Sequence, residues 1–212
     1  MITLAFDTCL DKMYAVLKKD GEVLTSRIIE NHDNKYHSAF LISTLQEIMS
    51  KNGIKPQDID LIATNIGPGS FTGIRACVTV ARVMAQQLNC KVVGISSLEI
   101  LAHAIDEHHF VRNVSRSDGG FIVTLDARKN SAYLYKDGEI KGAVSLDEVK
   151  EFAKTYNVLT DDKLQPILGG VSYQQMNLPL GETLTDLAEQ SNFDGDWRKL
   201  KPLYIQPPPM GG

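Results

Sequence analysis

The chain has 212 residues, an apolar content of 43%, a charged content of 23% and a formal net charge of −4. Its length suits one large domain or two smaller ones, and its composition is ordinary for a soluble globule. No segment approaches the roughly 20 apolar residues of a membrane span, and the acidic balance argues against this chain alone holding a nucleic-acid backbone.

The cysteines and the first residues indicate a cytoplasmic protein. Cys9, Cys77 and Cys90 are few and match no zinc spacing, which is typical of packed thiols in a reducing compartment. No basic flank precedes the apolar residues at the start, so a secretory signal is not expected. We therefore expect a cytoplasmic chain without a membrane segment.

The first part of the chain reads as an antiparallel meander followed by a helix. Strands are predicted at residues 2–7, 13–18 and 22–29. The Asp20-Gly21 pair between the second and third strands is a strong hairpin signal. Residues 37–51 contain no glycine or proline and carry leucines at helical spacing, and Asn52-Gly53 is typical of a helix end.

A glycine-rich turn joins the next predicted strand, residues 60–65, to a predicted helix at residues 72–88. The turn reads Gly67-Pro68-Gly69-Ser70-Phe71-Thr72-Gly73-Ile74-Arg75. Glycines beside the free N–H groups of a helix start point first to phosphate binding. The Walker pattern fails because Ile74 stands where its lysine belongs, and the dinucleotide pattern fails because Thr72 replaces the third glycine.

The alternative is that this turn is a structural loop. In that interpretation Phe71 packs inside and Arg75 lies on the first helical turn. A strand at residues 91–95 follows, and then Ser96 and Glu99 offer a capping box for a short helix that reaches about residue 105.

The second half of the chain resembles the first. Asp7 ends the first strand and a Lys-Asp-Gly-Glu turn follows at residues 19–22, while Asp126 precedes the same turn at residues 136–139. A helix at 146–156 and a strand at 166–168 are then expected. Asp-Gly turns are common, so chance similarity is an alternative, but the shared order of elements favours duplication.

Duplication predicts two lobes, one at residues 1–105 and a reduced one at 106–212 that ends in an extended tail. The polar, aperiodic residues 103–119 are the expected hinge. Three strands followed by alternating helices and strands, occurring twice, is the arrangement of the actin, sugar-kinase and Hsp70 (ASKHA) superfamily. The predicted fold class is therefore α/β, with two tandem ribonuclease-H-like lobes built on mixed sheets.

Within that superfamily the chain resembles the TsaB (YeaZ) family of tRNA threonylcarbamoyladenosine biosynthesis subunits. The residues that carry the resemblance are Asp7-Thr8-Cys9, His37-Ser38, the turn at 67–75, Asp126-Ala127-Arg128 and Pro202-Leu203-Tyr204-Ile205. Two positions depart from the family pattern, since Ala39 replaces a glutamate and Gln206 replaces an arginine. These departures put in doubt the contacts that the family makes through those side chains.

The resemblance implies a non-catalytic subunit needed for threonylcarbamoylation of adenosine-37 in ANN-decoding tRNAs. It implies that the chain binds and activates the transferase TsaD, that the ATPase TsaE joins the complex, and that tRNA is met only through the complex. It also implies a homodimer when the chain is alone. ATP and metal are expected in TsaD and TsaE, and no cofactor is expected in this chain.

Two aspartates are the candidate residues for nucleotide catalysis. In the superfamily, acidic residues on the first strand of each lobe hold Mg²⁺ for phosphoryl transfer, and Asp7 and Asp126 stand in corresponding places. No glycine follows either residue to admit a phosphate. We interpret them as vestigial cleft residues that make turn hydrogen bonds, and keep a small-molecule kinase or ATPase as the alternative.

Other catalytic arrangements are weak. His32 and His37 are five residues apart, which turns their imidazoles apart on a helix, so no metal site is predicted. Ser70 lacks the nucleophile-elbow pattern and Cys9 has no basic neighbour in the sequence, so a glycoprotease-like hydrolase remains only an alternative. No catalytic residue is therefore assigned.

Apolar residues beyond one stripe on each of the two first-lobe helices predict a partner interface. The predicted residues are Phe40, Leu41, Thr44, Leu45, Ile48, Val80, Val83, Met84 and Gln87. In the resembled family this helix pair docks on TsaD and also pairs with itself. The alternatives are that both helices have wide core-facing sides, or that the chain is a homodimeric binding module with no link to tRNA.

Overall fold

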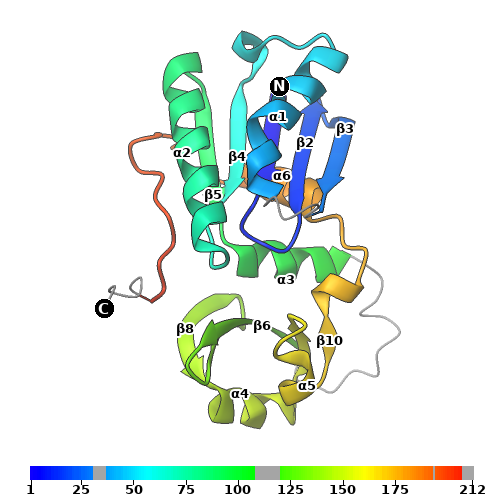
Figure 1. The fold of residues 1–212 in the computed structure, drawn as a ribbon, viewed down its shortest axis with the longest axis vertical. Coiled ribbons are helices and arrows are strands. Elements are labelled where there is room, and N and C mark those ends of the chain that lie inside the picture. Colours follow the sequence, from blue (N-terminus) through cyan, green and yellow to red (C-terminus); the bar gives the residue numbers. More distant parts are fainter. Residues whose placement is uncertain (31–36, 108–119, 193, 207–212) are drawn as a thin grey trace. The chain divides into compact units, whose positions relative to one another are not determined.

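The computed structural model describes residues 1–30, 37–107, 120–192 and 194–206 (Figure 1). His32, the pair at 108 and 109, most of the expected hinge and the proline-rich end at 207–212 lie outside the described residues. The chain forms two compact units. The first lobe comprises Met1–Ser97 and Leu180–Leu203, and the second lobe comprises Leu98–Pro179 and the residues from Tyr204 on.

The first lobe contains a mixed five-stranded sheet in the order β3-β2-β1-β4-β5. Its strands are β1 (Ile2–Asp7), β2 (Met13–Lys19), β3 (Glu22–Ile29), β4 (Leu61–Asn65) and β5 (Lys91–Ile95). β1, β2 and β3 pair antiparallel, and β4 pairs parallel with both β1 and β5. Asp20 and Gly21 both have positive φ, as the predicted hairpin between β2 and β3 requires.

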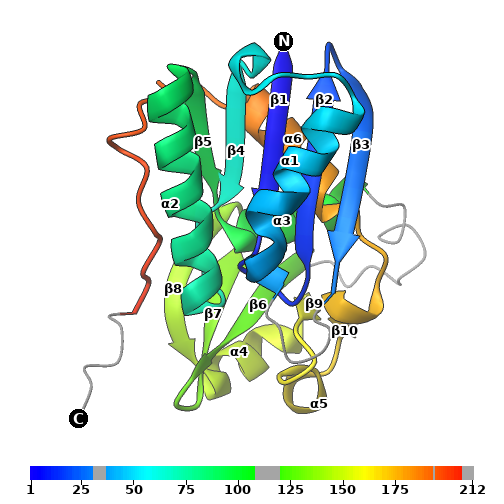
Figure 2. The ribbon, with the colours of Figure 1, turned by 45° about the horizontal axis from the view of Figure 1, so that its top comes forward.

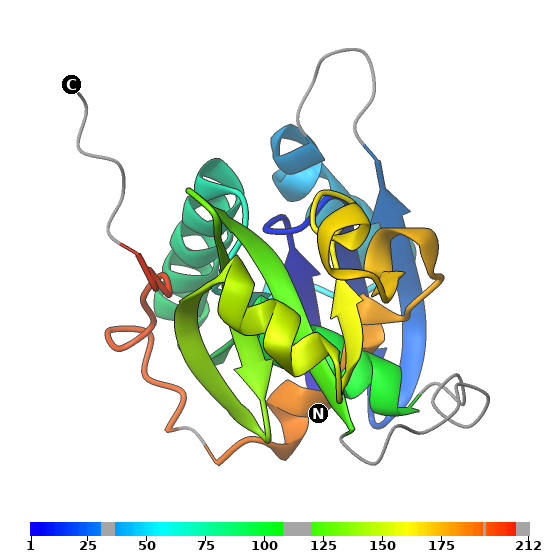
Figure 3. The ribbon, with the colours of Figure 1, turned by 90° about the horizontal axis from the view of Figure 1, so that it is seen from below.

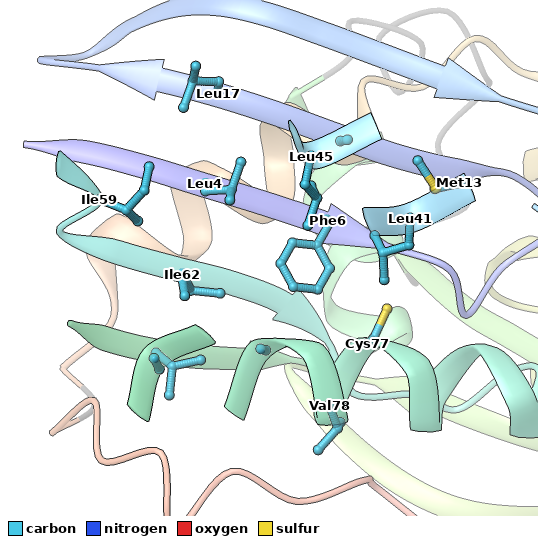
Figure 4. Packing of buried hydrophobic residues seen from close by; sticks show 14 of the residues in the cluster. Leu4, Phe6, Met13, Leu17, Leu41, Leu45, Ile59, Ile62, Cys77 and Val78 are labelled. Carbon is cyan, nitrogen blue, oxygen red and sulfur yellow. The ribbon is translucent and has the colours of Figure 1, made fainter. Parts of the chain in front are cut away.

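Helices cover both faces of this sheet. A 3₁₀ turn at His37–Phe40 leads into α1 (Leu41–Lys51), and α1 lies beside α2 (Phe71–Leu88) on one face (Figure 2). The core on that face joins Leu4 and Phe6 of β1 to Leu41 of α1 and Cys77 of α2 (Figure 4). The opposite face is covered by α6 (Leu180–Gln190), which packs on β1 and β2.

The residues of β2 alternate between these two helical layers, as the two-residue period of a strand requires. Met13, Ala15 and Leu17 belong to the core under α1 and α2. Lys18 points the other way and binds two carboxylates of α6, Asp186 and Glu189.

The segment after α6 returns along the outer edge of β5. The Val92 amide donates to the Gly195 carbonyl at 3.1 Å, and the Leu203 amide donates to the Ile66 carbonyl at 2.8 Å. We call residues 191–203 the returning segment. Because α6 and this segment pack on the first sheet, the expected division at residues 105 and 106 needs correction, and residues 180–203 belong to the first lobe.

The second lobe begins with α3 (Ser97–Glu107) and holds a second mixed five-stranded sheet in the order β10-β9-β6-β7-β8. Its strands are β6 (Phe121–Arg128), β7 (Ser131–Lys136), β8 (Glu139–Ser145), β9 (Asn157–Thr160) and β10 (Val171–Ser172). Its helix α4 (Leu146–Ala153) lies over one face of the sheet, as the yellow-green helix in Figure 3 shows. The predicted fold class is confirmed: both sheets combine three antiparallel strands with parallel neighbours.

Two expectations for this lobe are wrong. The helix that begins at residue 146 ends at Ala153, and residues 157–160 form the strand that follows. The expected strand at 166–168 is the short helix α5 (Gln165–Leu168), where Pro166 occupies the first helical turn. Proline is tolerated there because the amides of the first turn have no partner within the helix. No helix in the described ranges is long and apolar enough to cross a membrane.

The ion group that ties α6 to β2 gives a stability test. The Lys18 side chain is only 10% exposed, and its ammonium lies 2.8 Å from Glu189 Oε2 and also binds Asp186. Burial lowers the pKa of Lys18, but the hydrogen bonds to these carboxylates outweigh burial and raise it. A raised pKa means that the stabilisation is complete below the ordinary lysine pKa and is lost only as the pH rises through the raised value.

We therefore expect Lys18→Met to lower the free energy of unfolding by about 1–2 kcal/mol at neutral pH, because two carboxylates lose their cation. Lys19→Met, at the exposed next position, is the matched control and is expected to change it by less than about 0.5 kcal/mol. Urea unfolding followed by circular dichroism measures both. Equal losses in the two variants would show that the contact with α6 contributes nothing.

Candidate functional site

The glycine-rich turn at residues 67–73 closes on the turn that follows β1. The Ser70 amide donates to the Cys9 carbonyl at 2.8 Å. A β-carbon placed on Gly69 would lie 2.3 Å from that same carbonyl oxygen, and one placed on Gly73 would lie 1.8 Å from the Thr8 carbonyl oxygen. No side chain fits at such distances, so these two glycines allow two stretches of backbone to touch.

The start of α2 is capped within the turn. Ser70 is the N-cap, and its hydroxyl accepts a hydrogen bond from the Gly73 amide at 3.3 Å. Gly67 has a φ of +102° and precedes a cis peptide bond to Pro68. The Ser70 cap and the close approach of Gly69 and Gly73 to neighbouring carbonyls therefore support the interpretation of this turn as a structural loop. One detail is wrong, because Phe71 is 42% exposed and its ring stacks under Arg75, with 3.9 Å between guanidinium and ring centre.

Asp7 holds this junction together. Its side chain is buried, and Oδ1 accepts a hydrogen bond from the Cys9 amide at 2.6 Å while Oδ2 accepts one from the Asn65 side chain at 2.9 Å. Asn65 Oδ1 in turn accepts from the Gly67 amide at 2.8 Å and from Ser97 at 2.9 Å. The carboxylate thus links the end of β1 to the end of β4 and to the glycine-rich turn.

Asn65 was not identified from the sequence. It lies at the carboxyl end of β4, which runs parallel to β1 with Thr64 opposite Phe6. A polar residue that ends a buried strand, next to the strand that ends in Asp7, was a signal that could have identified it, because parallel neighbours end at the same sheet edge.

A pair of buried thiols fills the space beside Asp7. Cys77 Sγ of α2 lies 3.1 Å from both the amide and the hydroxyl of Thr8. Burial raises the pKa of Cys9 well above its ordinary value, with the nearby Cys77 acting in the same direction. Cys9 is therefore a neutral packing group at physiological pH, and Cys77 is fully buried beside it.

Asp7, Cys9 and Cys77 place one donor atom each within 4.8 Å of one another, the only such group of three among the described residues. This donor set does not fit a metal ion. The Asp7 oxygens already accept hydrogen bonds, and the Cys9 thiol is held in its protonated form, whereas metal binding needs the thiolate.

Asp126 occupies the corresponding strand end in the second lobe. Its Oδ1 accepts from the Arg128 amide at 2.8 Å, its Oδ2 lies 3.4 Å from the Lys163 ammonium, and its own amide donates to Asp161 at 2.6 Å. Residues 128–130 follow with positive φ, which makes a tight hairpin. Asp126 is therefore held in a turn hydrogen bond, as predicted, and Asp161 is a further acidic residue that the sequence analysis missed.

The predicted partner interface divides into buried and exposed parts. Four of its residues lie on the buried side of α1, so they belong to the core and are not available to a partner: Leu41, Thr44, Leu45 and Ile48. Phe40, Val80 and Met84 are half-buried, Gln87 is exposed, and Val83 is 53% exposed. The predicted interface therefore needs correction on α1.

The sequence analysis missed Ile42, whose side chain is 50% exposed on α1. Ile42 follows Leu41 by one residue, which is about 100° around a helix, so it points away from the core stripe. An apolar residue off the core stripe was the signal, but the broad apolar pattern of α1 hid it.

Comparison with known proteins identifies the family. The family model described as TsaD, tRNA N6-adenosine threonylcarbamoyltransferase, matches residues 24–172. The chain belongs to the TsaD family. Among curated relatives, the "tRNA threonylcarbamoyladenosine biosynthesis protein TsaB" of Bacillus subtilis is 30% identical over 148 residues, which are 68% of this chain and 60% of that protein. The protein of the same name from Haemophilus influenzae is 30% identical over 130 residues, 61% of this chain and 51% of that one.

A solved structure, YeaZ from Pseudomonas aeruginosa, matches the fold with a TM-score of 0.71 at 22% sequence identity, over 96% of this chain and 99% of that chain. This likeness shows the fold. The resemblance to TsaB (YeaZ) is thus confirmed, while the chain spans about half to three-fifths of the length of the curated TsaB relatives that it matches.

Gly73→Ala tests whether the glycine-rich turn is closed, that is, packed against the backbone of Thr8 and Cys9. Helix propensity alone would make this change stabilising by roughly 1 kcal/mol. Because the new methyl group would overlap the Thr8 carbonyl, we expect the free energy of unfolding to fall by at least about 2 kcal/mol.

Ala76→Gly on the same helix is the control for propensity and is expected to cost roughly 1 kcal/mol. Chemical denaturation of both variants decides the question. A stabilised Gly73→Ala protein would mean that the turn stands open.

Proposed function

We propose that this chain is a non-catalytic subunit that acts in threonylcarbamoylation of adenosine-37 in ANN-decoding tRNAs. It would do so by binding and activating the transferase TsaD. The proposal is supported by the family model, which carries the name of that transferase, and by relatives whose names assign them to threonylcarbamoyladenosine biosynthesis. TsaE, the ATPase of the system, would join the complex.

The observation that carries the non-catalytic role is the closed turn in the first lobe. A phosphate-binding turn needs glycine backbone open to the ligand. Here Gly69 and Gly73 face the carbonyl oxygens of Cys9 and Thr8, which are electron-rich and repel an anion. Asp7 is committed to the Cys9 amide and to Asn65. ATP and the metal ion would accordingly be held by TsaD and TsaE.

The surface that would bind TsaD is an apolar face on α1 and α2, which we call the docking face. It consists of Phe40, Ile42, Val80, Val83 and Met84. α1 and α2 lie side by side on the same side of the first sheet (Figure 2), so these residues belong to one helical layer. Exposed apolar side chains on neighbouring helices are typical of a helix-packing interface. Without TsaD, the same face would pair two copies of this chain.

Ile42→Glu and Val83→Glu test the docking face. Each places a charge where a half-exposed apolar side chain would become buried by the partner, so we expect each to abolish co-elution with TsaD. Matched controls put the same charge on exposed neighbours outside the face, as Ser43→Glu on α1 and Gln86→Glu on α2. The controls are expected to co-elute normally, and all four variants are expected to remain folded by circular dichroism.

The functional readout is the level of N6-threonylcarbamoyladenosine in tRNA from cells that lack this gene. The wild-type chain and the two controls are expected to restore it, and the two docking-face variants are not. Normal levels in the deleted cells would remove the link to tRNA modification. Unchanged co-elution of both docking-face variants would instead move the partner site elsewhere.

A further inference from the structure

One side of α2 is basic, although the chain as a whole is acidic. The eighteen residues of α2 contain Arg75 and Arg82 and no aspartate or glutamate. The returning segment adds Arg198, Lys199 and Lys201, against only Asp194 and Asp196. We call these five cationic residues, together with Trp197, the basic strip.

The basic strip and the docking face occupy different sides of α2. Arg75 and Arg82 are seven residues apart, about two helical turns, and so share one side. Val83 is turned by about 100° from Arg82, and Met84 by about 200°. In Figures 1 and 2 the orange-to-red returning segment runs along α2 on the side away from α1. Arg82 faces this segment, because its guanidinium lies 5.8 Å from the Trp197 ring centre, while the Arg75 guanidinium lies over the Phe71 ring of its own helix.

Two guanidinium groups approach the ring of Trp197, which is partly buried and packs against the core of the first lobe. Arg82 approaches its ring at 5.8 Å and Arg198 at 4.8 Å. Stacking on an aromatic ring orients a guanidinium while its N–H groups remain in the plane of the fork, where they can bind phosphate oxygens in pairs. In the part of the chain that the structure describes, no carboxylate lies within ion-pair distance of Arg82.

The two acidic residues of the returning segment do not cancel the positive charge of the basic strip. Asp196 pairs with Arg198 at 3.3 Å, and Asp194 pairs with Lys199. The arginine and lysine side chains of these pairs are each 70% exposed. Exposed ion pairs contribute little free energy and give way readily to another anion. The strip therefore keeps an excess of positive charge along one side of the first lobe.

We propose that the basic strip binds the phosphate backbone of RNA. An elongated row of arginine and lysine side chains suits a polyanion, because each cation can neutralise a phosphate. Naming tRNA as the RNA rests on the proposed function. The strip then gives this chain a direct contact with the tRNA, beside the surface that holds the transferase. The net charge of −4 predicts that binding by the chain alone is weak.

The experiment uses the single tryptophan of the chain as the probe. The purified 212-residue chain is titrated with unmodified tRNA at about 20 mM salt while Trp197 fluorescence is recorded, and the titration is repeated as the salt concentration rises. We expect a saturable change that weakens with salt. The charge-loss variant Arg82→Gln/Arg198→Gln is expected to bind about tenfold more weakly or worse, with a salt slope smaller by about two.

Three further variants make the result decisive. Arg27→Gln removes a cation from β3 and is the matched control, expected to bind like wild type. Arg198→Gln alone changes an exposed side chain, so a weaker affinity in this variant cannot come from misfolding. Val83→Glu is expected to lose binding to TsaD and to keep the fluorescence response to tRNA. The charge-loss variant is expected to keep binding to TsaD and to lose the response to tRNA. These opposite outcomes separate the two proposals.

Equal tRNA affinity for wild type and the charge-loss variant would overturn the inference. So would the absence of any salt-sensitive fluorescence change. A response to polyglutamate as strong as that to tRNA would also overturn it, since the strip would then be a site for an acidic protein.

Discussion

The carbonyl oxygens of Thr8 and Cys9 lie where the β-carbons of residues 73 and 69 would be in any other amino acid. This backbone contact joins the end of β1 to the start of α2, and it is stabilised by the Ser70 amide on Cys9 and by Asp7, which reaches the Cys9 amide and Asn65. The glycines that would suit a phosphate loop are thus used for packing. The position of α2, and with it the docking face and the basic strip, depends on this contact.

The two lobes show the same order of strands with different uses of the leading aspartate. In the first lobe Asp7 is buried and bound by neighbouring elements, and two thiols and a threonine fill the space around it. In the second lobe Asp126 is partly exposed and bound by the hairpin that follows it and by Lys163. In each lobe the leading carboxylate accepts a hydrogen bond from the backbone amide two residues further on. In our proposal the chain serves as a docking body.

Sequence patterns predicted the elements whose cause is local. The Asp20-Gly21 and Asp137-Gly138 turns, the strands beside them and the helix after the glycine-rich turn follow from turn chemistry and periodicity, and all are present. The expected strand at 166–168 was wrong because Pro166, with its fixed φ, suits the first turn of a helix. The return of residues 180–203 to the first sheet could not be read from the sequence, since it depends on contacts between segments far apart in the chain.

The same distinction applies to the candidate site. Asp7 and the glycine-rich turn were each recognisable from the sequence, but their contact and the direction in which Gly69 and Gly73 face are tertiary properties. The apolar content of α1 and α2 predicted an interface, yet an apolar stripe looks the same in sequence whether a sheet or a partner covers it. Only the packing distinguishes Leu45, which is in the core, from Val83, which is exposed.

Hydrogen exchange of the Ser70 amide, measured by NMR with and without Mg²⁺ and a nonhydrolysable ATP analogue, tests the closed turn most directly. If the turn is closed on Cys9, this amide exchanges slowly in the free protein despite its place in a loop, and the nucleotide changes neither its exchange rate nor its chemical shift. Rapid exchange in the free protein that becomes slow when the nucleotide is added would contradict the account, because it would show an open turn that closes on phosphate.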